Sequence, residues 1–410
     1  MGKSRTGVRL VALLFCGPSW ASLALTSDLI VHRVADPVAL DALADECTEL
    51  QTRAWPRLPF TTPRWLSAWW RHYGEQRLLI RDEFFVHALR DERGRLVAVA
   101  PLTLTTRPAA GPLRARSLAF FGSDQNVTEL RGMLCAPEDE PRVVKSLLGY
   151  LWQRKNDWDW FVWTGVRHSE AHAILSETAG FNWTHSAPDY VLPLPATWEE
   201  FRASRSRNIK ESIRKCYNSL KRADHEFRFC VVSEADALPG ALARFFRLHT
   251  IRAHAPGLLG HADVFVSARA REFLLDLARE AGHLPRLHVF ELEIAGEVVA
   301  SRVGFLLDDE LYLYFSGYDP SWGRFSVMTT VVVEAIKWAI ERQCRLVNLS
   351  PGDDVSKTRW RATVVRYERG VLVSPTERAR LMFGVLRELD SKSRTDTVLG
   401  RMLARARRNG

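Results

Sequence analysis

The sequence predicts a mixed α/β (α+β) fold made of two similar domains in tandem, each a mixed sheet flanked by helices. Three observations lead to this prediction. The chain has 410 residues, which is too long for a single core. Apolar residues alternate in some segments and recur at helical spacing in others, which indicates both strands and helices. The same order of segments also appears twice, as a duplication would produce.

A β-hairpin opens the repeated unit in each half. Residues 84–104, FFVHALRDERGRLVAVAPLTL, alternate apolar and polar side chains on both sides of a turn that contains Gly94. Residues 286–307 alternate in the same way around Gly296. We expect the two hairpins to occupy equivalent positions in the fold.

A strand, a helix and a second strand follow each hairpin. They are residues 129–135, 140–155 and 159–166 in the first half, and 310–318, 326–343 and 345–352 in the second. A strand–helix–strand unit of this length predicts a right-handed crossover between parallel strands. The first of the two helices begins in the acidic stretch APEDEPR (136–142), which would repel phosphate.

A basic stretch, SRSRNIKESIRKCYNSLKR (204–222), lies between the two halves, and Thr197 is a candidate helix N-cap before it. Its apolar residues fall near one helical face: Ile209, Ile213, Tyr217 and Leu220. We therefore expect an amphipathic helix whose apolar face packs on the second domain, followed by another helix over 236–254. Nucleic-acid binding would need more aromatic side chains nearby, so nucleic acid is not an expected partner.

The composition is that of an ordinary globular protein, with 46% hydrophobic and 26% charged residues. The net charge of +9 favours anionic partners, including peripheral contact with an anionic membrane. Six scattered cysteines form no CxxC pair, which predicts free thiols, a cytoplasmic location and no metal site. No stretch reaches the roughly 18 apolar residues that a transmembrane helix needs.

The expected domain boundaries follow from these patterns. Residues 1–27 form a leader that imitates a weak signal peptide, although a misassigned start or a disordered leader is the preferred interpretation. Residues 28–195 form the first domain, 196–375 form the second, opened by the basic helix, and 376–410 form a basic tail.

Several motifs resemble a known family. SGYDPSWGRFS (316–326), GDDVSKTRW (352–360) and SRSRNIKESIRK (204–215) resemble segments of the acetyltransferase domain of the cellulose-biosynthesis family, a FemAB-like branch of the GNAT superfamily. LPFTTPRWLSAWWRHYG (58–74) resembles the N-terminal region of that family. The resemblance covers roughly residues 28–375.

The resemblance implies two GNAT-like domains and an acyltransferase. Its donor would be acyl-CoA, bound as a substrate and not as a permanent cofactor, and its acceptor an amine or hydroxyl of a small molecule or glycan precursor. The family also implies a role in exopolysaccharide or envelope biosynthesis. One departure concerns the donor: the family has Ser-Pro-Gly at the start of the main helix, where this chain has Ser326, Val327 and Met328.

The start of the 326–343 helix is the candidate donor site. Free N–H groups and the helix dipole favour phosphate at a helix start, and Arg324 adds a positive charge. Alternatively, Ser326 caps the helix and does nothing more. The candidate donor-binding residues are Arg324, Phe325, Ser326, Val327, Met328 and Thr329.

Candidate catalytic residues lie at the ends of two expected strands. Tyr318 could protonate the leaving thiolate, Asp353 or Asp354 could accept the acceptor's proton, and Lys357 could bind an anionic group of the acceptor. Packing or solvated-loop roles remain open for each of them. The candidate substrate-binding residues are Arg207, Asn208, His249, Arg252 and Trp360.

Two other functions remain open. A FemAB-like transferase could use aminoacyl-tRNA as its donor. A non-catalytic GNAT-fold scaffold could recruit partners at a membrane surface, and the altered Ser326–Met328 segment favours it.

Overall fold

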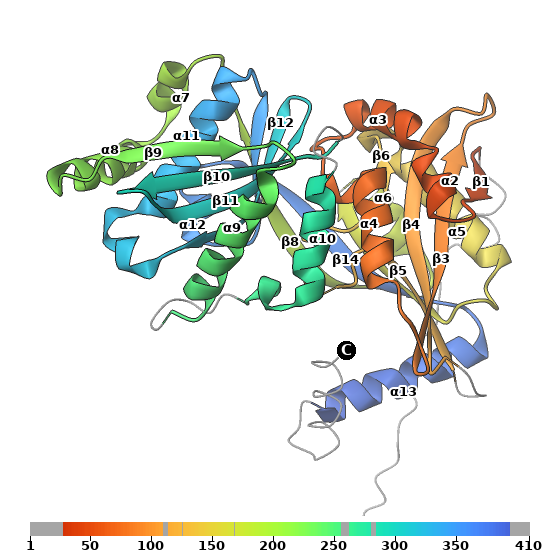
Figure 1. The fold of residues 1–410 in the computed structure, drawn as a ribbon. Coiled ribbons are helices and arrows are strands. Elements are labelled where there is room, and N and C mark those ends of the chain that lie inside the picture. Colours follow the sequence, from red (N-terminus) through yellow and green to blue (C-terminus); the bar gives the residue numbers. More distant parts are fainter. Residues whose placement is uncertain are drawn as a thin grey trace, which may run out of the picture.

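The computed structural model describes residues 28–109, 114–124, 126–167, 169–255, 262–279 and 284–393 (Figure 1). The expected leader, residues 1–27, and the end of the expected basic tail, residues 394–410, lie outside these ranges. None of the described helices is both long enough and apolar enough to cross a membrane.

The first half contains the expected hairpin, the crossover helix and the strand after it, among other elements. In chain order, its α-helices and strands are β1 (Ile30–Arg33), α2 (Pro37–Asp41), α3 (Ala44–Arg53), α4 (Pro63–Tyr73), β2 (Gln76–Arg77), β3 (Ile80–Arg90), β4 (Leu96–Arg107), β5 (Ala115–Phe120), β6 (Leu134–Cys135), α5 (Glu140–Gln153), β7 (Trp160–Arg167), α6 (Glu170–Glu177) and β8 (Phe181–Pro193).

The second half repeats this order. It contains α7 (Trp198–Ser204), α8 (Arg207–Arg222), β9 (Phe227–Val232), α9 (Leu238–Ala253), α10 (Ala268–Arg279), β10 (Arg286–Ile294), β11 (Glu297–Leu307), β12 (Glu310–Tyr318), α11 (Val327–Glu341), β13 (Leu346–Pro351), α12 (Val355–Thr358), β14 (Thr363–Val373) and α13 (Glu377–Ser393).

All the strands of the described chain join one sheet whose order reads almost the same from both ends. It runs β1-β3-β4-β5-β7-β14-β8-β13-β12-β11-β10-β9, so the two halves meet at the centre of the sheet (Figure 1). The hairpins β3–β4 and β10–β11 hold equivalent positions, as expected from the sequence. The mixed α/β class and the duplication are therefore confirmed.

The last strand of each half is exchanged between the halves. β14 from the second half pairs with β7, while β8 from the first half pairs with β13, and these two exchanged strands pair with each other. The exchange merges what the sequence suggested as two sheets into one. It also leaves neither half with an open edge at the centre of the molecule.

Each half contains one parallel crossover. Helix α5 connects the parallel strands β5 and β7, and α11 connects the parallel strands β12 and β13. The predicted helical connections between parallel strands are confirmed, and their right-handed sense stays a prediction. The first-half strand, however, was placed wrongly at 129–135. The strand that enters the crossover is β5, and of the predicted segment only Leu134–Cys135 pairs, with β4. Bends that include Gly122 (φ 100°) separate β5 from that segment, and β5 and β6 both pair antiparallel with β4.

The hydrophobic core also joins the halves. Phe60, just before α4, packs with its ring centroid 5.2 Å from that of Tyr312 on β12. Trp65 on α4 lies 4.9 Å from Phe273 on α10. The neighbouring backbone N–H of Arg57 donates to the carboxylate of Glu310. The other faces of the sheet are covered by α8 and α11 in the second half and by α5 and α6 in the first.

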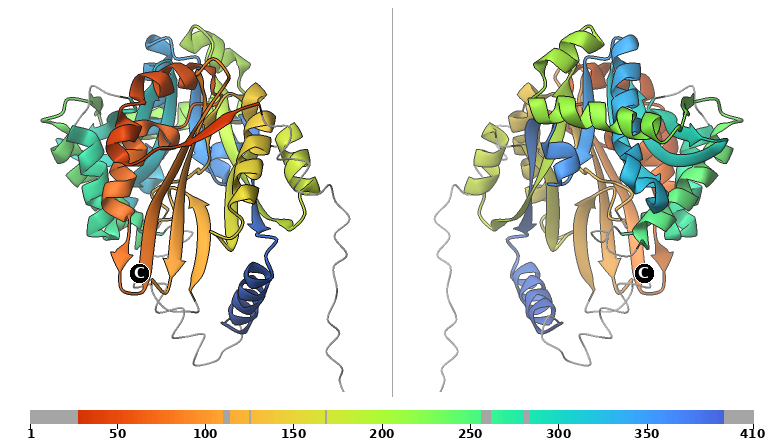
Figure 2. Two further views of the ribbon diagram at one scale, coloured as in Figure 1. Left: turned by 90° about the vertical axis from the view of Figure 1, so that its right-hand side faces the viewer. Right: turned by 90° about the vertical axis from the view of Figure 1, so that its left-hand side faces the viewer.

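The basic stretch forms one helix, α8, and a separate short helix, α7, precedes it. Thr197 caps the short helix α7 by accepting from the N–H of Glu200, and α8 begins anew at Arg207. The apolar face of α8 packs on α11, with Ile209 and Ile213 buried there. The intramolecular packing expected for this helix is confirmed. Helix α13, in contrast, extends away from the sheet (Figure 2).

Candidate active site

The site begins where two parallel strands of the second half separate. β12 and β13 pair only over Glu310–Tyr312 and residues 346–348, and β12 then continues without β13 beside it. Two residues of β12, Tyr314 and Phe315, oppose one residue of β11, so a β-bulge bends β12 at the same place. The sheet therefore opens at the carboxyl ends of the strands, where α/β folds place their ligands.

A cationic pocket of about 210 Å³ lies at this opening and reaches the start of α11. Met328 and Thr329 of α11 line it. Four positively charged side chains from different elements also line it, and we call the cavity the cationic pocket after them: Arg252, Arg302, Lys357 and Arg359.

Hydrogen bonds hold the four cations in place. Arg252 donates to Ser316 Oγ over 2.7 Å, Arg302 to the carbonyl of Leu313 over 3.1 Å, and Arg359 to Thr329 Oγ1 over 3.0 Å; Lys357 donates to the carbonyl of Pro351. Among the described residues, nothing accepts a hydrogen bond from Nε of Arg302 or Arg359. The Nε donors of these two arginines are therefore unused within the described chain.

Burial lowers the pKa values of the cations that line this pocket. Burial lowers the pKa values of Lys357 and Arg359, and it lowers the pKa of Arg302 to about 10. With a pKa of about 10, Arg302 is still charged at neutral pH. Asp354 is one acidic neighbour, 3.5 Å from Lys357, and it also caps α12 by accepting from the N–H of Ser356.

The start of α11 adds to the positive character of the cationic pocket. Ser326 adopts a left-handed conformation (φ 58°) and makes no side-chain cap. Its carbonyl accepts from the N–H groups of Thr329 and Thr330, so within the described chain the N–H groups of Val327 and Met328 have no acceptor. The helix dipole places partial positive charge at the same point. The arrangement suits a phosphate, pyrophosphate or carboxylate.

A larger cavity of about 470 Å³, here called the interface pocket, lies between the two halves. The first half contributes Glu129 and Arg131, and the second contributes Phe315 and Pro351, together with residues of the exchanged strands β8 and β14. The two pockets are neighbours, because Phe315 lines one and the adjacent Ser316 lines the other. Lys357 of the cationic pocket likewise bonds the carbonyl of Pro351.

Glu129 is the strongest candidate for a general base. Burial raises its pKa to about 7, although Lys357 and a hydrogen bond of 2.8 Å from the Tyr312 hydroxyl act in the opposite direction. A carboxyl with such a pKa can take up a proton at neutral pH, which is how enzymes prepare glutamate bases. Asp189, which accepts from Asn348 over 2.7 Å, is a second raised carboxyl, with a pKa of about 6. Sequence reasoning missed Glu129, since it placed this residue in an ordinary strand.

Part of the predicted site is assembled at the cationic pocket: Arg252, Met328, Thr329 and Lys357 all line it. Two other predicted residues lie close by. His249 is buried beneath β12 and contacts the carbonyl of Ser316 at 3.0 Å, and the Tyr318 ring lies 5.7 Å from the Arg252 guanidinium.

The remaining predicted residues lie outside both pockets. The exposed carboxylate of Asp353 accepts from the Tyr190 hydroxyl over 2.6 Å. Arg207 pairs with Glu211 in solvent. The rest divide between surface and core: Asn208 and Arg324 are exposed, Ser326 is half-buried, and Phe325, Val327 and Trp360 are buried in the core beside α11.

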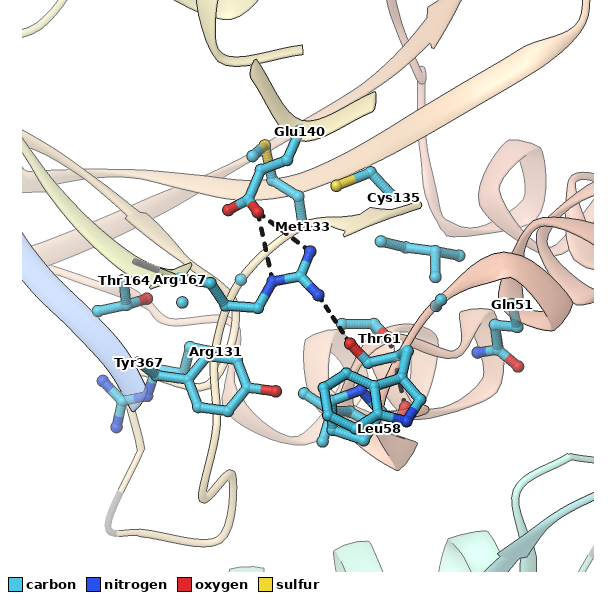
Figure 3. Close-up of a pocket in the computed structure, with 16 residues that line it drawn as sticks. Gln51, Leu58, Thr61, Arg131, Met133, Cys135, Glu140, Thr164, Arg167 and Tyr367 are labelled. Carbon is cyan, nitrogen blue, oxygen red and sulfur yellow. Dashed lines mark hydrogen bonds and ion pairs between the residues drawn. The ribbon is translucent and has the colours of Figure 1, made fainter. Parts of the chain in front are cut away.

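The corresponding end of the first half is closed to an anion. Its pocket, of only about 50 Å³, lies at the start of α5 (Figure 3). The carboxylate of Glu140 occupies the helix start and pairs with Arg167 at 3.0 Å. Arg167 also donates to the carbonyl of Trp55. This helix start is therefore acidic, as expected, and its Glu140 carboxylate is neutralised by the ion pair with Arg167.

Comparisons with known proteins agree with the fold. Residues 205–361 match the family model of an acetyltransferase (GNAT) domain. No curated protein matches the chain. The structure of FemX is 11% identical, over 80% of this chain and 95% of that chain, with a TM-score of 0.52. A conserved protein of unknown function from Bacteroides thetaiotaomicron VPI-5482 is 12% identical, over 84% of this chain and 100% of that chain, with a TM-score of 0.50.

At these identities the likeness to the two solved structures shows the fold alone. The family match places a GNAT-type domain in the second half, and the sheet order shows that the first half repeats its topology. The protein therefore has a tandem GNAT-like fold. The narrower cellulose-biosynthesis family, expected from the motifs, is not confirmed by these matches.

Proposed function

We propose that the protein is an acyltransferase that moves an acyl group from acyl-CoA to an amine or hydroxyl acceptor. The cationic pocket at the start of α11, next to Glu129, is the observation that supports this proposal. The donor's phosphates would lie on the free N–H groups of α11 beside Arg359, which donates to Thr329 at that helix start. Lys357 would lie at the thioester end, because it interacts electrostatically with Glu129. The thioester would then reach the gap between β12 and β13.

The proposed reaction is a direct transfer. Glu129 takes a proton from the acceptor as its nitrogen or oxygen attacks the thioester carbonyl. The new C–N or C–O bond forms, the C–S bond breaks, and the leaving thiolate takes a proton from the Lys357 ammonium, which solvent later restores. Glu129 is favoured over Asp353 as the base because Asp353 is exposed and already bonded to Tyr190.

The nature of the donor has one competing proposal. Aminoacyl-tRNA is also anionic at the end that would enter the pocket, and Ser326, Val327 and Met328 lack the glycine that the resembling family has there. We favour acyl-CoA, which implies a cytoplasmic protein. The proposed link to exopolysaccharide or envelope assembly rests on the motif resemblance.

Calorimetric titration with acetyl-CoA and a longer acyl-CoA tests the proposal. Arg359→Met removes a cation that lines the pocket, and Arg324→Met is the matched control, since Arg324 is exposed near the same helix start. We expect Arg359→Met to lose about tenfold or more in affinity, corresponding to about 1.4 kcal/mol, and Arg324→Met to lose little. Equal losses of affinity in the two variants would place the donor site nearer the exposed Arg324. No binding by the wild type would favour the aminoacyl-tRNA or scaffold alternatives.

A further inference from the structure

The interface pocket contains a cation that the proposed transfer chemistry does not use. The pocket's volume of about 470 Å³ lies in the range of small-molecule sites. Glu129 lies at the side that neighbours the cationic pocket, and Arg131 lines the same cavity. The following inference rests on the proposed function, because it concerns the acceptor of that reaction.

Arg131 is a desolvated cation without a direct partner. Within the described chain its guanidinium makes no hydrogen bond or ion pair. Burial lowers its pKa, and the nearest opposing charge is Asp124. The Asp124 carboxylate, however, is already bonded by Trp69 at 2.8 Å and by Thr128 at 2.7 Å. A half-buried charge without a partner is costly, and an anionic ligand would offset that cost.

The backbone of Arg131 is held against the sheet of the first half. Gly165 on β7 has φ 80°, and a Cβ added there would lie 2.3 Å from the Arg131 carbonyl oxygen. Only glycine permits this close approach. Arg131 is therefore carried on a fixed segment, as expected for a side chain that positions a ligand.

Two more basic residues line the interface pocket and are exposed to solvent. Arg369 and His185 come from the exchanged strands β14 and β8, line the same pocket, and are exposed at its mouth. Phe315 and Tyr367 add aromatic surface to the lining of the pocket. The pocket thus contains two carboxylates, Glu129 and Glu368, together with the cations Arg131 and Arg369.

We propose that the interface pocket binds an acceptor that carries both a primary amine and an anionic group, with the amine at Glu129 and the anion at Arg131. The anionic group is a carboxylate or a phosphate, so an amino acid and an amino-sugar phosphate share the required chemistry. The proton released by the amine passes to Glu129, and the anionic group takes no part in bond making.

Acceptor kinetics with acetyl-CoA test this proposal. One arm compares glycine with glycinamide, and the other compares glucosamine 6-phosphate with glucosamine. We expect the anionic member of at least one pair to have a kcat/KM at least tenfold higher than its neutral analogue. Arg131→Met should remove that preference without changing the KM for acetyl-CoA, and Arg131→Lys should restore part of it. If Arg131→Met does not fold, Arg369→Met removes the other arginine that lines the pocket. It then tests the same preference for an anionic acceptor.

The results separate this inference from the proposed function. If the wild type fails to bind acetyl-CoA in the calorimetric titration, the proposed function fails. If it binds acetyl-CoA but prefers the neutral amines, treats both members of each pair alike, or acylates none of the four, the acceptor proposal is overturned and the donor assignment stands. Retention of the preference in Arg131→Met also overturns it.

Discussion

Glu129→Gln should stabilise the protein at alkaline pH while it impairs turnover. Burial raises the pKa of Glu129 from an ordinary 4.5 to about 7. Below pH 4.5 the carboxyl is protonated in both the folded and the unfolded chain. Between the two values the folded protein retains a proton that the unfolded chain has released, so the free energy of unfolding falls as pH rises through this window. Glutamine has no proton to lose and avoids that loss.

The magnitude follows from the size of the pKa shift. One pKa unit corresponds to about 1.4 kcal/mol, so the loss for the wild type amounts to about 3 kcal/mol above pH 7 and to about 1 kcal/mol at pH 5. Relative to the wild type, Glu129→Gln should therefore gain about 2 kcal/mol between pH 5 and pH 8. For a chain of this length that gain corresponds to about 2 to 3 °C in melting temperature. The amide oxygen of the introduced glutamine can still accept from the Tyr312 hydroxyl, so little packing is lost.

Thermal unfolding of both proteins at pH 5 and pH 8 measures the gain, and thiol release from acetyl-CoA measures turnover. Loss of a general base should reduce kcat by about 10²-fold or more. Glu368→Gln removes another carboxylate from the same pocket and serves as the control, with turnover close to wild type. A melting-temperature difference that is the same at both pH values, together with normal turnover in Glu129→Gln, would refute the reasoning.

Three other changes test the donor site, the packing of α9 and the basic helix. Thr329→Asp places a carboxylate in the cationic pocket and should weaken acetyl-CoA binding by about tenfold or more without lowering the melting temperature; unchanged affinity in a titration would place the donor elsewhere. Gly317→Ala should cost about 1–3 kcal/mol in urea unfolding, because its Cβ would lie 2.3 Å from the backbone of α9, whereas Gly384→Ala meets nothing within 4 Å and is the control. Lys210→Glu with Arg214→Glu, on the exposed face of α8, should leave melting temperature and acetyl-CoA affinity unchanged; loss of a tight, salt-sensitive binding to RNA would contradict the intramolecular role of this helix.

Local patterns were sufficient to predict most of the fold. The hairpins, the two crossover helices and the strands that follow them have strong period-2 or helical signals, and such signals depend on neighbouring residues only. The short strand β5 was missed because its sequence, ARSLAF, alternates too weakly to stand out. The exchange of β8 and β14 could not be predicted, since either strand would fit the same place beside β7 or β13 by its own pattern.

Some residues of the candidate site could likewise be predicted from local patterns, and others could not. Met328, Thr329 and Lys357 were predicted because a helix start and a strand end are visible in the sequence, and all three residues line the cationic pocket. Arg302 lies inside a regular alternating hairpin, where nothing distinguishes it from a solvent-facing arginine. Glu129 owes its raised pKa to burial between the halves, and burial of that kind depends on contacts between residues far apart in the chain, such as that with Tyr312.

The two halves of the duplication differ in structure at their equivalent helix starts. In the first half the helix start that would bind a donor is occupied by Glu140 and its ion pair with Arg167. In the second half the equivalent helix start carries no carboxylate and opens into the cationic pocket. The first half instead contributes Glu129 and Arg131 to the interface pocket, and the exchanged strands supply walls from both halves. Neither half can form that pocket alone, so the exchange of strands couples correct assembly of the sheet to formation of the proposed acceptor site.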